Sequence, residues 1–154
     1  MHTTWLFTVA VIFGLTTLTT SKKVCETGWI PYGDLCYNFS NTSTTFKDAV
    51  TSCYGMSSNL VEPNAVAEER WLLVQGVVRG IRRIWIGVTD LLQNQTFVYI
   101  SNGIDVEEAY NNWDKGQPDP DDTEHCVALP AGYKGWHDYP CDSMFNFVCT
   151  RGKN

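Results

Sequence analysis

The sequence predicts one α+β domain braced by disulfide bonds. Three observations indicate this class. Apolar residues recur at helical spacing in two stretches between residues 45 and 80, short runs of β-branched and aromatic residues follow, and six cysteines are spread along the chain. A length of 154 residues suits one domain, or one domain with an export segment. We therefore expect a single domain over residues 22–154.

Residues 1–21 have the pattern of a secretory signal peptide. Residues 5–18 form an apolar run of fourteen, shorter than the roughly 20 residues that span a membrane. Small residues follow at residues 19–21, where a signal peptidase could cleave. A buried N-terminal helix is the alternative, since no Lys or Arg precedes the run. No later stretch is apolar enough to cross a membrane, so we expect a soluble, secreted, extracellular protein.

The first elements of the mature chain are predicted to be a hairpin and a helix. Residues 25–40 alternate apolar residues with turn formers such as Gly33 and Asp34, which is typical of a hairpin. The helix is expected to begin after Thr45, whose hydroxyl can cap it, and to end near Gly55. Its apolar face should consist of Phe46, Ala49, Val50 and Cys53.

A second helix is predicted after Pro63, with Asn64 as its N-cap and its end at Gly76 or Gly80. Glutamates in its first turns suit the positive end of a helix. Its apolar side should consist of Trp71, Leu72 and Val74.

The chain changes to short strands from Ile84 onward. Runs of β-branched and aromatic residues predict strands over residues 84–88, 96–100, 126–129 and 145–149. Residues 101–124 are rich in Asn, Asp, Gly and Pro and have no regular period. Because long structureless segments in compact domains are uncommon and tend to be functional, we expect an ordered binding loop there.

The charge of the chain narrows the classes of partner. Seventeen acidic and eleven basic residues leave a formal net charge of −6. Such a chain has no electrostatic footprint for phosphate backbones or anionic lipid, so neither nucleic-acid nor membrane-surface binding is expected. No nucleophile elbow, phosphate-binding loop or His-Glu-x-x-His motif is present, so we do not expect an enzyme.

Cysteines and sequons agree with an exported protein. Six cysteines can all pair, although 15 connectivities remain open. Zinc binding is the rival use, but no Cys-x-x-Cys pair occurs. Three tripeptides of the glycosylation type begin at Asn38, Asn41 and Asn94.

Oxygen-bearing side chains concentrate in and just after the long loop. Calcium takes six to eight oxygen ligands, whereas transition metals favour clustered His or Cys, which are missing here. Acids in a loop can also serve only to keep it solvated. We favour calcium because Trp113, Pro118 and the nearby Cys126 and Cys141 would fix the loop geometry. The candidate oxygen donors are Gln117, Asp119, Asp121, Asp122, Glu124 and Asp138.

The ordered set of motifs resembles the C-type lectin-like domain family, in its long, six-cysteine form, over essentially the whole mature chain. The matching segments are Cys25 and Cys36, Trp85-Ile86-Gly87, Gln117-Pro118-Asp119, Glu124-His125-Cys126, Trp136-His137-Asp138, Pro140-Cys141 and Phe147-Val148-Cys149. The resemblance implies two helices, small antiparallel sheets and a long calcium-binding loop. It also implies the disulfides Cys25–Cys36, Cys53–Cys149 and Cys126–Cys141.

The resemblance further implies a calcium ion to which two neighbouring sugar hydroxyls bind. Its ligands would be Gln117, Asp119, Glu124 and Asp138, with a cis peptide bond before Pro118. The same side chains, together with His137 and Tyr133, would contact the sugar. The Gln-Pro-Asp order is similar to that of galactose and N-acetylgalactosamine readers.

This chain departs from the family pattern at several positions. His137 stands where the family has Asn, so an amide ligand is lost, and no Trp follows Asp119 to stack on a sugar ring. Tyr133 or His137 would have to supply that face, since Trp136 is expected in the core. The family's auxiliary calcium site keeps Asp90 and Glu124 but not its other acids, so we expect it to be empty. The mannose-type motif Glu62-Pro63-Asn64 precedes the second helix and is interpreted as a helix start.

Two hypotheses follow. The first is a secreted, calcium-dependent lectin for glycans that end in galactose or N-acetylgalactosamine, with a role in innate recognition or agglutination. The second is the same fold used to bind a protein or another surface without calcium or sugar, which the His137 substitution favours. All six cysteines are used by the implied pairings, so any homo-oligomer is expected to be noncovalent.

Overall fold

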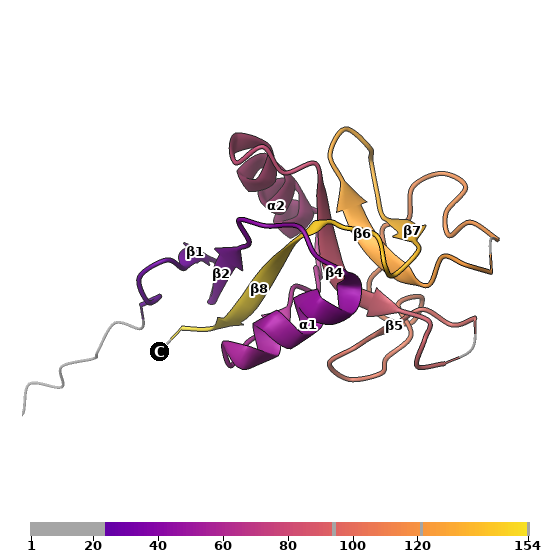
Figure 1. Cartoon of the computed structure of the whole chain (residues 1–154), viewed down its shortest axis with the longest axis horizontal. Coiled ribbons are helices and arrows are strands. Elements are labelled where there is room, and N and C mark those ends of the chain that lie inside the picture. The colour runs from indigo at the N-terminus through magenta and orange to yellow at the C-terminus, as the bar shows by residue number, and fades with distance from the viewer. Residues whose placement is uncertain (1–23, 94, 121, 154) are drawn as a thin grey trace, which may run out of the picture.

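The computed structural model describes residues 24–93, 95–120 and 122–153 (Figure 1). The expected signal peptide and Asn94 lie outside the described residues. The helices are α1 (Phe46–Gly55) and α2 (Val66–Val78). The strands are β1 (Ile30–Tyr32), β2 (Leu35–Phe39), β3 (Asn59–Leu60), β4 (Arg83–Thr89), β5 (Val98–Tyr99), β6 (Cys126–Pro130), β7 (His137–Tyr139) and β8 (Asn146–Gly152).

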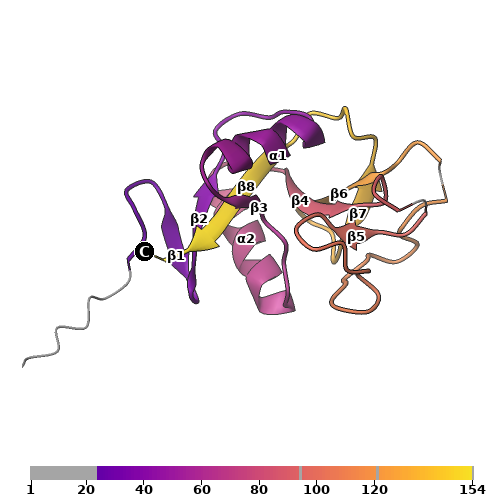
Figure 2. The same cartoon turned by 90° about the horizontal axis from the view of Figure 1, so that it is seen from below.

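The strands follow the order β1-β2-β8-β4-β6-β7, with β3 paired to β8 and β5 paired to β4. All pairs are antiparallel except β4 with β8, which run parallel. Helices α1 and α2 lie on opposite sides of β8 (Figure 1 and Figure 2). The hairpin β1–β2 and the C-terminal strand form one end of the molecule, and the loops around β5, β6 and β7 form the other. The α+β class is confirmed.

Helix α1 begins and ends as its sequence predicts. The Thr45 hydroxyl accepts a hydrogen bond from the Asp48 amide, and the helix ends at Gly55. Phe46, Ala49 and Cys53 are buried and pack with β4 and β8 residues, including Trp85 and Phe147. Burying this stripe, rather than the intrinsic propensity of ten residues, is what stabilises the helix.

Helix α2 differs from its prediction at both its cap and its buried face. Ala65, not Asn64, is the N-cap, and it makes no side-chain cap bond. The Asn64 amide instead donates to the Glu68 carboxylate at 3.1 Å. Val74 is 59% exposed, so its placement on the apolar side was wrong, whereas Leu72 is buried as expected. Glu68 and Glu69 occupy the buried face because each meets hydrogen-bond donors there.

The three disulfides implied by the resemblance are all present: Cys25–Cys36, Cys53–Cys149 and Cys126–Cys141. The first joins the segment before β1 to β2. The second ties α1 to β8, closing a loop of 96 residues. The third links β6 to the segment after β7 and closes 15 residues at the loop end. Each therefore braces a different part of the fold.

Four predicted strands are observed, as β4, β5, β6 and β8. The short strands β3 and β7 were not predicted, because two or three residues are too few to show a period. The predicted hairpin is β1–β2, with Tyr32 opposite Leu35. Within the described residues, none of the helices has the length and apolar character needed to cross a bilayer.

Candidate functional site

The long loop is joined to the β6–β7 hairpin by backbone hydrogen bonds. The Asp114 amide donates to the Trp136 carbonyl at 3.1 Å, and the Trp136 amide donates to the Asn112 carbonyl at 2.7 Å. A Cβ atom at Gly135 would overlap the Asn112 carbonyl oxygen, so only glycine permits this approach. Trp136 is fully buried, as predicted, and its ring packs edge-on against Trp113.

Buried carboxylates reach from the body of the fold into this loop. Glu69 on α2 accepts hydrogen bonds from Asn112 Nδ2 at 2.6 Å and from Trp136 Nε1. Glu62 accepts from the Ser101 amide at 2.9 Å and from the Ser101 hydroxyl at 2.6 Å. Burial raises the pKa of both carboxyls, which the hydrogen bonds from their partners oppose. The Glu62-Pro63-Asn64 tripeptide thus anchors the start of the loop.

Three of the four predicted calcium ligands lie close together or on one hollow. The Gln117–Pro118 peptide bond is cis, as the resemblance implies. The Asp119 amide donates to Asp138 Oδ1 at 3.0 Å. Asp119 also lines a hollow of about 560 Å³ together with Glu124 and Pro118. Asp138 is only 2% exposed, and its burial raises the pKa of its carboxyl.

Two oxygens of this set are buried without a partner. Within the described part of the chain, Gln117 Oε1 and Asp138 Oδ2 accept no hydrogen bond. Buried polar atoms are almost always satisfied, and an uncompensated carboxylate oxygen is costly. Oxygens of these two kinds are ligands that a hard cation such as calcium prefers. Among the described residues, no three His, Cys, Asp or Glu side chains converge as a ready metal cluster.

His137 is engaged by two neighbouring side chains, Asp114 and Tyr133. Its Nε2 lies 3.1 Å from Asp114 Oδ2, and this hydrogen bond lowers the pKa of the Asp114 carboxyl. The other flank of the imidazole meets the ring of Tyr133 edge-on, with centroids 4.6 Å apart. Tyr133 is 55% exposed on the β6–β7 hairpin and lines a different hollow from Asp119 and Glu124.

At the family's auxiliary calcium site, the one described acid besides Glu124, Asp90, contacts a histidine. Asp90 Oδ1 lies 2.9 Å from His125 Nδ1, so the carboxylate that would bind a second ion is paired with an imidazole. Of the two further candidate oxygen donors in this part of the loop, Asp122 is exposed and Asp121 lies outside the described residues.

The two described sequons differ in accessibility. Asn38 is partly buried in β2, and its Nδ2 donates to the Gly28 carbonyl at 3.1 Å. Asn41 is exposed in the bend after β2. A glycan on Asn38 would be attached to the amide nitrogen that donates this hydrogen bond. The side chain of Asn41 is exposed to solvent.

Sequence reasoning missed three residues that hold the site: Glu69, Asn112 and Asp114. For Glu69 a signal existed, because Glu68, Glu69, Leu72 and Gly76 share one helical face and all are buried. Asn112 and Asp114 lie in an aperiodic loop, where no pattern reveals a partner.

The chain is similar to known proteins in sequence and in fold. The family model described as Lectin C-type domain matches residues 42–151. The chain is 30% identical to lithostathine-1-beta of Homo sapiens over 139 residues, which cover 87% of this chain and 82% of that protein. It is 26% identical to a C-type lectin mannose-binding isoform from Oxyuranus scutellatus, with 94% of each covered. The carbohydrate-recognition domain of the mouse scavenger receptor C-type lectin superposes with a TM-score of 0.75 at 35% identity, covering 84% of this chain and 98% of that domain.

Proposed function

The chain belongs to the C-type lectin domain family, and we propose that it is a calcium-dependent carbohydrate-binding protein for glycans ending in galactose or N-acetylgalactosamine. Domains of this family are generally binding modules rather than enzymes, and they typically bind calcium. The similar domain of the mouse scavenger receptor C-type lectin is a carbohydrate-recognition domain. A lectin-like function is therefore the starting point, and the ion and the sugar are what remain to be tested.

The pair of unpartnered buried oxygens carries the proposal. Gln117 Oε1 and Asp138 Oδ2 come from the two sides of the site, one from the long loop and one from β7. A calcium ion held by Gln117, Asp119, Glu124 and Asp138 would supply both with a positive partner and offer open positions to two adjacent sugar hydroxyls. The carboxylates would accept hydrogen bonds from those hydroxyls, and the Gln117 amide nitrogen would donate to one of them.

The preference for galactose rests on the order of amide and acid. Gln117 precedes Pro118 and Asp119 follows it, so donor and acceptor stand in the galactose-type arrangement that the resemblance implies. The snake relative, by contrast, is named as a mannose-binding isoform. The comparison of galactose with mannose is therefore the informative test of specificity.

Calorimetric titration of calcium, followed by a glycan array with calcium and with chelator, tests the proposal. We expect saturable calcium uptake and chelator-sensitive binding to galactose-type glycans. Asp138→Asn or Glu124→Gln should abolish both together, because the sugar binds through the ion. Asp34→Asn removes one carboxylate from the exposed turn of the distant β1–β2 hairpin and should change neither. Absence of calcium uptake by the folded wild type would refute the proposal.

One observation favours a second function, the binding of a protein or another surface without calcium. His137 replaces an amide ligand and is hydrogen-bonded to Asp114, which leaves the ion one oxygen short. If this function is correct, the array shows no chelator-sensitive glycan, and chelator leaves the free energy of unfolding unchanged. A rise in thermal stability on adding calcium would exclude it, since a ligand that binds the folded state stabilises that state.

We also propose that residues 1–21 are a secretory signal and that residues 22–154 are the extracellular product. Three disulfides support an oxidising compartment. Expression in a eukaryotic secretory host should yield product lacking the first 21 residues. Glycopeptide mass spectrometry should find Asn41 occupied more fully than Asn38, and it also tests Asn94. Retention of the intact N-terminus on secreted protein would contradict the cleavage.

A single carbohydrate site of this kind binds weakly, so useful recognition requires several copies of the protein. Millimolar affinity corresponds to only about 4 kcal/mol, so several sites must act together. None of the described cysteines is free, so the homo-oligomer we propose is noncovalent. Sedimentation at increasing protein concentration tests it, and a monomer at every concentration would contradict it.

A further inference from the structure

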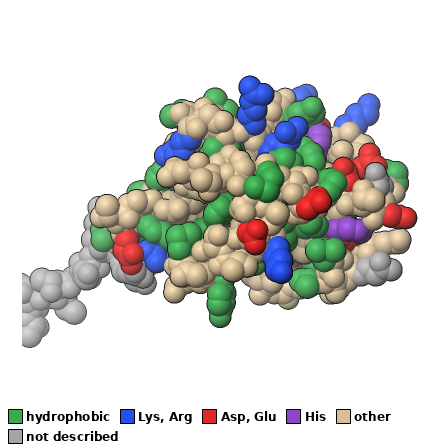
Figure 3. Space-filling view, viewed as in Figure 1, with side chains coloured by type: hydrophobic (Ala, Val, Ile, Leu, Met, Phe, Trp, Pro, Cys, Tyr) green, Lys and Arg blue, Asp and Glu red, His purple; other side chains and the backbone are tan. Residues whose placement is uncertain are grey.

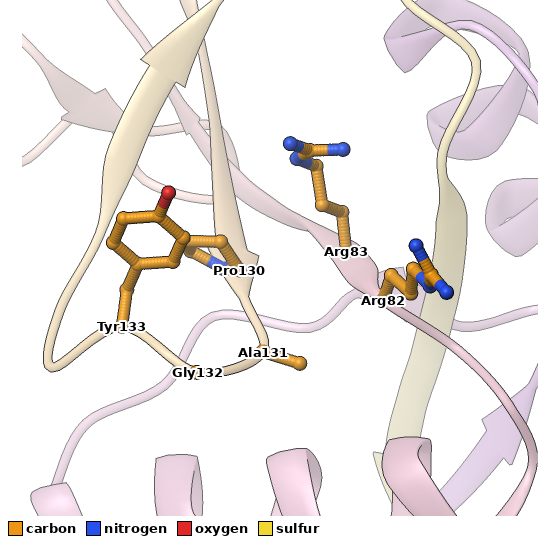
Figure 4. Close-up of a pocket in the computed structure, with 6 residues that line it drawn as sticks. All are labelled: Arg82, Arg83, Pro130, Ala131, Gly132 and Tyr133. Carbon is orange, nitrogen blue, oxygen red and sulfur yellow. The ribbon is translucent and has the colours of Figure 1, made fainter.

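We propose that a hollow between the start of β4 and the β6–β7 hairpin binds the anionic group of an acidic saccharide, a sulfate ester or a carboxylate, without calcium. The hollow measures about 470 Å³ and is lined by Arg82, Arg83, Pro130, Ala131, Gly132 and Tyr133 (Figure 4). It lies apart from Asp119 and Glu124, which line another hollow. The proposal does not depend on the calcium site.

Arg83 is held in place but keeps donors to offer. Its Nε donates to the Tyr139 hydroxyl at 3.3 Å, and its guanidinium lies over the rings of Tyr139 and Phe145, 5.4 and 5.3 Å from their centroids. Aromatic stacking of this kind fixes the planar fork of arginine and so lowers the entropy lost on binding an oxyanion. In Figure 4 the Arg83 guanidinium and the Tyr133 hydroxyl point the same way from opposite sides of the hollow.

Arg82 lies next to Arg83, and the two residues together are called the cationic ridge below. Its side chain points away from Tyr133 in Figure 4, and both arginines also line a second hollow of about 240 Å³ beside Phe145 and Asn146. Within the described residues, neither arginine forms an ion pair with a carboxylate. Two adjacent guanidinium groups without acidic partners are suited to charge-assisted bonds with a sulfate or carboxylate.

The local charge is opposite to that of the whole chain. Residues 70–89 contain four arginines and no acid, and residues 125–137 contain Lys134 and no acid, although the formal net charge is −6. In Figure 3, several Lys and Arg side chains lie along the upper edge, which Figure 1 shows to be formed by α2, the β6–β7 hairpin and the neighbouring loop, and several Asp and Glu side chains lie toward the loop end. A basic patch this small, next to an acidic end, favours a compact anion over a long polyanion, which the neighbouring acids would repel.

The surroundings of the ridge favour a saccharide as the carrier of that anion. The exposed ring of Tyr133 can pack against the apolar face of a sugar ring, and its hydroxyl can donate or accept a hydrogen bond. Tyr133 also contacts His137, the residue next to the buried Asp138. This contact joins the hollow to β7, and the hollow shares no lining residue with the one lined by Asp119 and Glu124.

The test measures binding of three matched glycoconjugates to the full secreted protein in the presence of chelator: 6-sulfated galactose, galacturonic acid and unsubstituted galactose. We expect the wild type to bind at least one acidic probe and not the neutral one, with affinity that falls as salt is raised. Arg82→Gln with Arg83→Gln should weaken that binding by at least about tenfold, given the strength of hydrogen bonds to charged groups. Inorganic sulfate should compete.

Lys134→Gln is the matched control, because it removes one positive charge from the same hairpin without altering the hollow. Arg82→Gln alone is a second test, since that side chain is exposed. In calcium, Arg82→Gln should leave binding of neutral galactose unchanged, so failure of this site is distinguishable from failure of the calcium site. Absence of acidic-probe binding in chelator, an equal loss in Lys134→Gln, or binding to vesicles of anionic lipid in place of the glycoconjugates would overturn the proposal.

Discussion

The two ends of this molecule are held together by different kinds of interaction. At the end formed by β1, β2, β8 and α1, apolar side chains such as Phe46, Leu60 and Val148 are buried, and two of the three disulfides cross that region. At the loop end, buried carboxylates accept hydrogen bonds that join separate segments: Glu62 with Ser101, and Glu69 with Asn112 and Trp136. The first end, the core end, is therefore held mainly by apolar packing and two disulfides, whereas the segments of the loop end, which contains the Cys126–Cys141 disulfide, are joined largely by polar contacts.

This difference separates what stabilises the fold from what can respond to its surroundings. Apolar burial and disulfides are insensitive to pH and to small ions, whereas a buried carboxylate depends on its protonation and on its donors. Two neighbouring residues represent the contrast. Glu68 accepts a hydrogen bond from the Tyr37 hydroxyl in the core end, and Glu69 accepts from the loop end.

Removing the Cys53–Cys149 disulfide should have the largest effect on stability. It closes 96 residues, and the chain-entropy relation gives about 4.7 kcal/mol for a loop of this order. The Cys126–Cys141 disulfide closes 15 residues, for which the same relation gives about 3 kcal/mol. Denaturant unfolding of the two double Cys→Ser variants measures the difference.

The same pair of variants tests whether the ends are separable. Loss of Cys126–Cys141 should impair calcium uptake at temperatures where the variant is still folded, because that bond joins β6 to the segment after β7. Loss of Cys53–Cys149 should lower the unfolding midpoint more and leave calcium affinity of the remaining folded protein unchanged. Equal effects of both variants on calcium affinity would remove the distinction between the two ends.

Glu69→Ala should cost about 2–4 kcal/mol, because it leaves two buried donors unpaired and a cavity on α2. Its effect should extend to the long loop, since Asn112 and Trp136 lose their shared acceptor. Hydrogen exchange should show faster exchange at the amides of Asp114 and Trp136. Glu68→Ala is the matched control, as its partners Tyr37 and Asn64 lie outside that loop.

If the comparison is correct, the two variants differ in where exchange accelerates rather than in how much stability they lose. Glu68→Ala should leave the loop amides protected and calcium uptake intact. Identical exchange profiles would show that α2 transmits its disturbance to both ends alike.

The same contrast explains which parts of the fold the sequence could predict. Phe46, Ala49 and Cys53 follow the helical period, and their burial was predictable because apolar packing leaves a regular pattern. The disulfides followed from the family resemblance and not from spacing, which left many pairings open. Val74 breaks the pattern, since it is apolar and exposed, while the buried Glu69 occupies a place that a binary pattern assigns to an apolar residue.

The sequence names candidate ligands for the site, which stay a prediction, but it does not give the contacts of those residues. Gln117, Asp119, Glu124 and Asp138 were identified by motif, and the Asp119–Asp138 contact agrees with that set. The partnership of His137 with Asp114 could not be foreseen, because it joins an aperiodic loop to a strand 23 residues away. Polar contacts between distant segments depend on the folded geometry of both, which local sequence does not encode.

A pH series should sharpen the comparison through Glu69. Burial raises the pKa of this carboxyl above its ordinary value of 4.5, so the folded state holds the proton to higher pH than the unfolded state does. The stability that Glu69 contributes is then greatest below that ordinary value and declines as pH rises through the raised pKa. Relative to Glu69→Gln, the free energy of unfolding of the wild type should fall as pH rises from 4.5 to the raised pKa, and it should level off at higher pH. A difference that is flat with pH would contradict the burial argument.

His137→Asn should have the smallest effect on stability and the most specific effect on the site. The substitution restores an amide oxygen at a position where the chain has an imidazole, and an amide oxygen is the better partner for a hard cation. We expect calcium affinity to rise about fivefold, the equivalent of about 1 kcal/mol, measured by calorimetry. His137→Ala separates the causes, because it also breaks the contact with Asp114 but adds no oxygen. If both variants raise the affinity equally, release of Asp114 is responsible. If neither does, residue 137 is no ligand, and the missing amide oxygen does not limit calcium affinity.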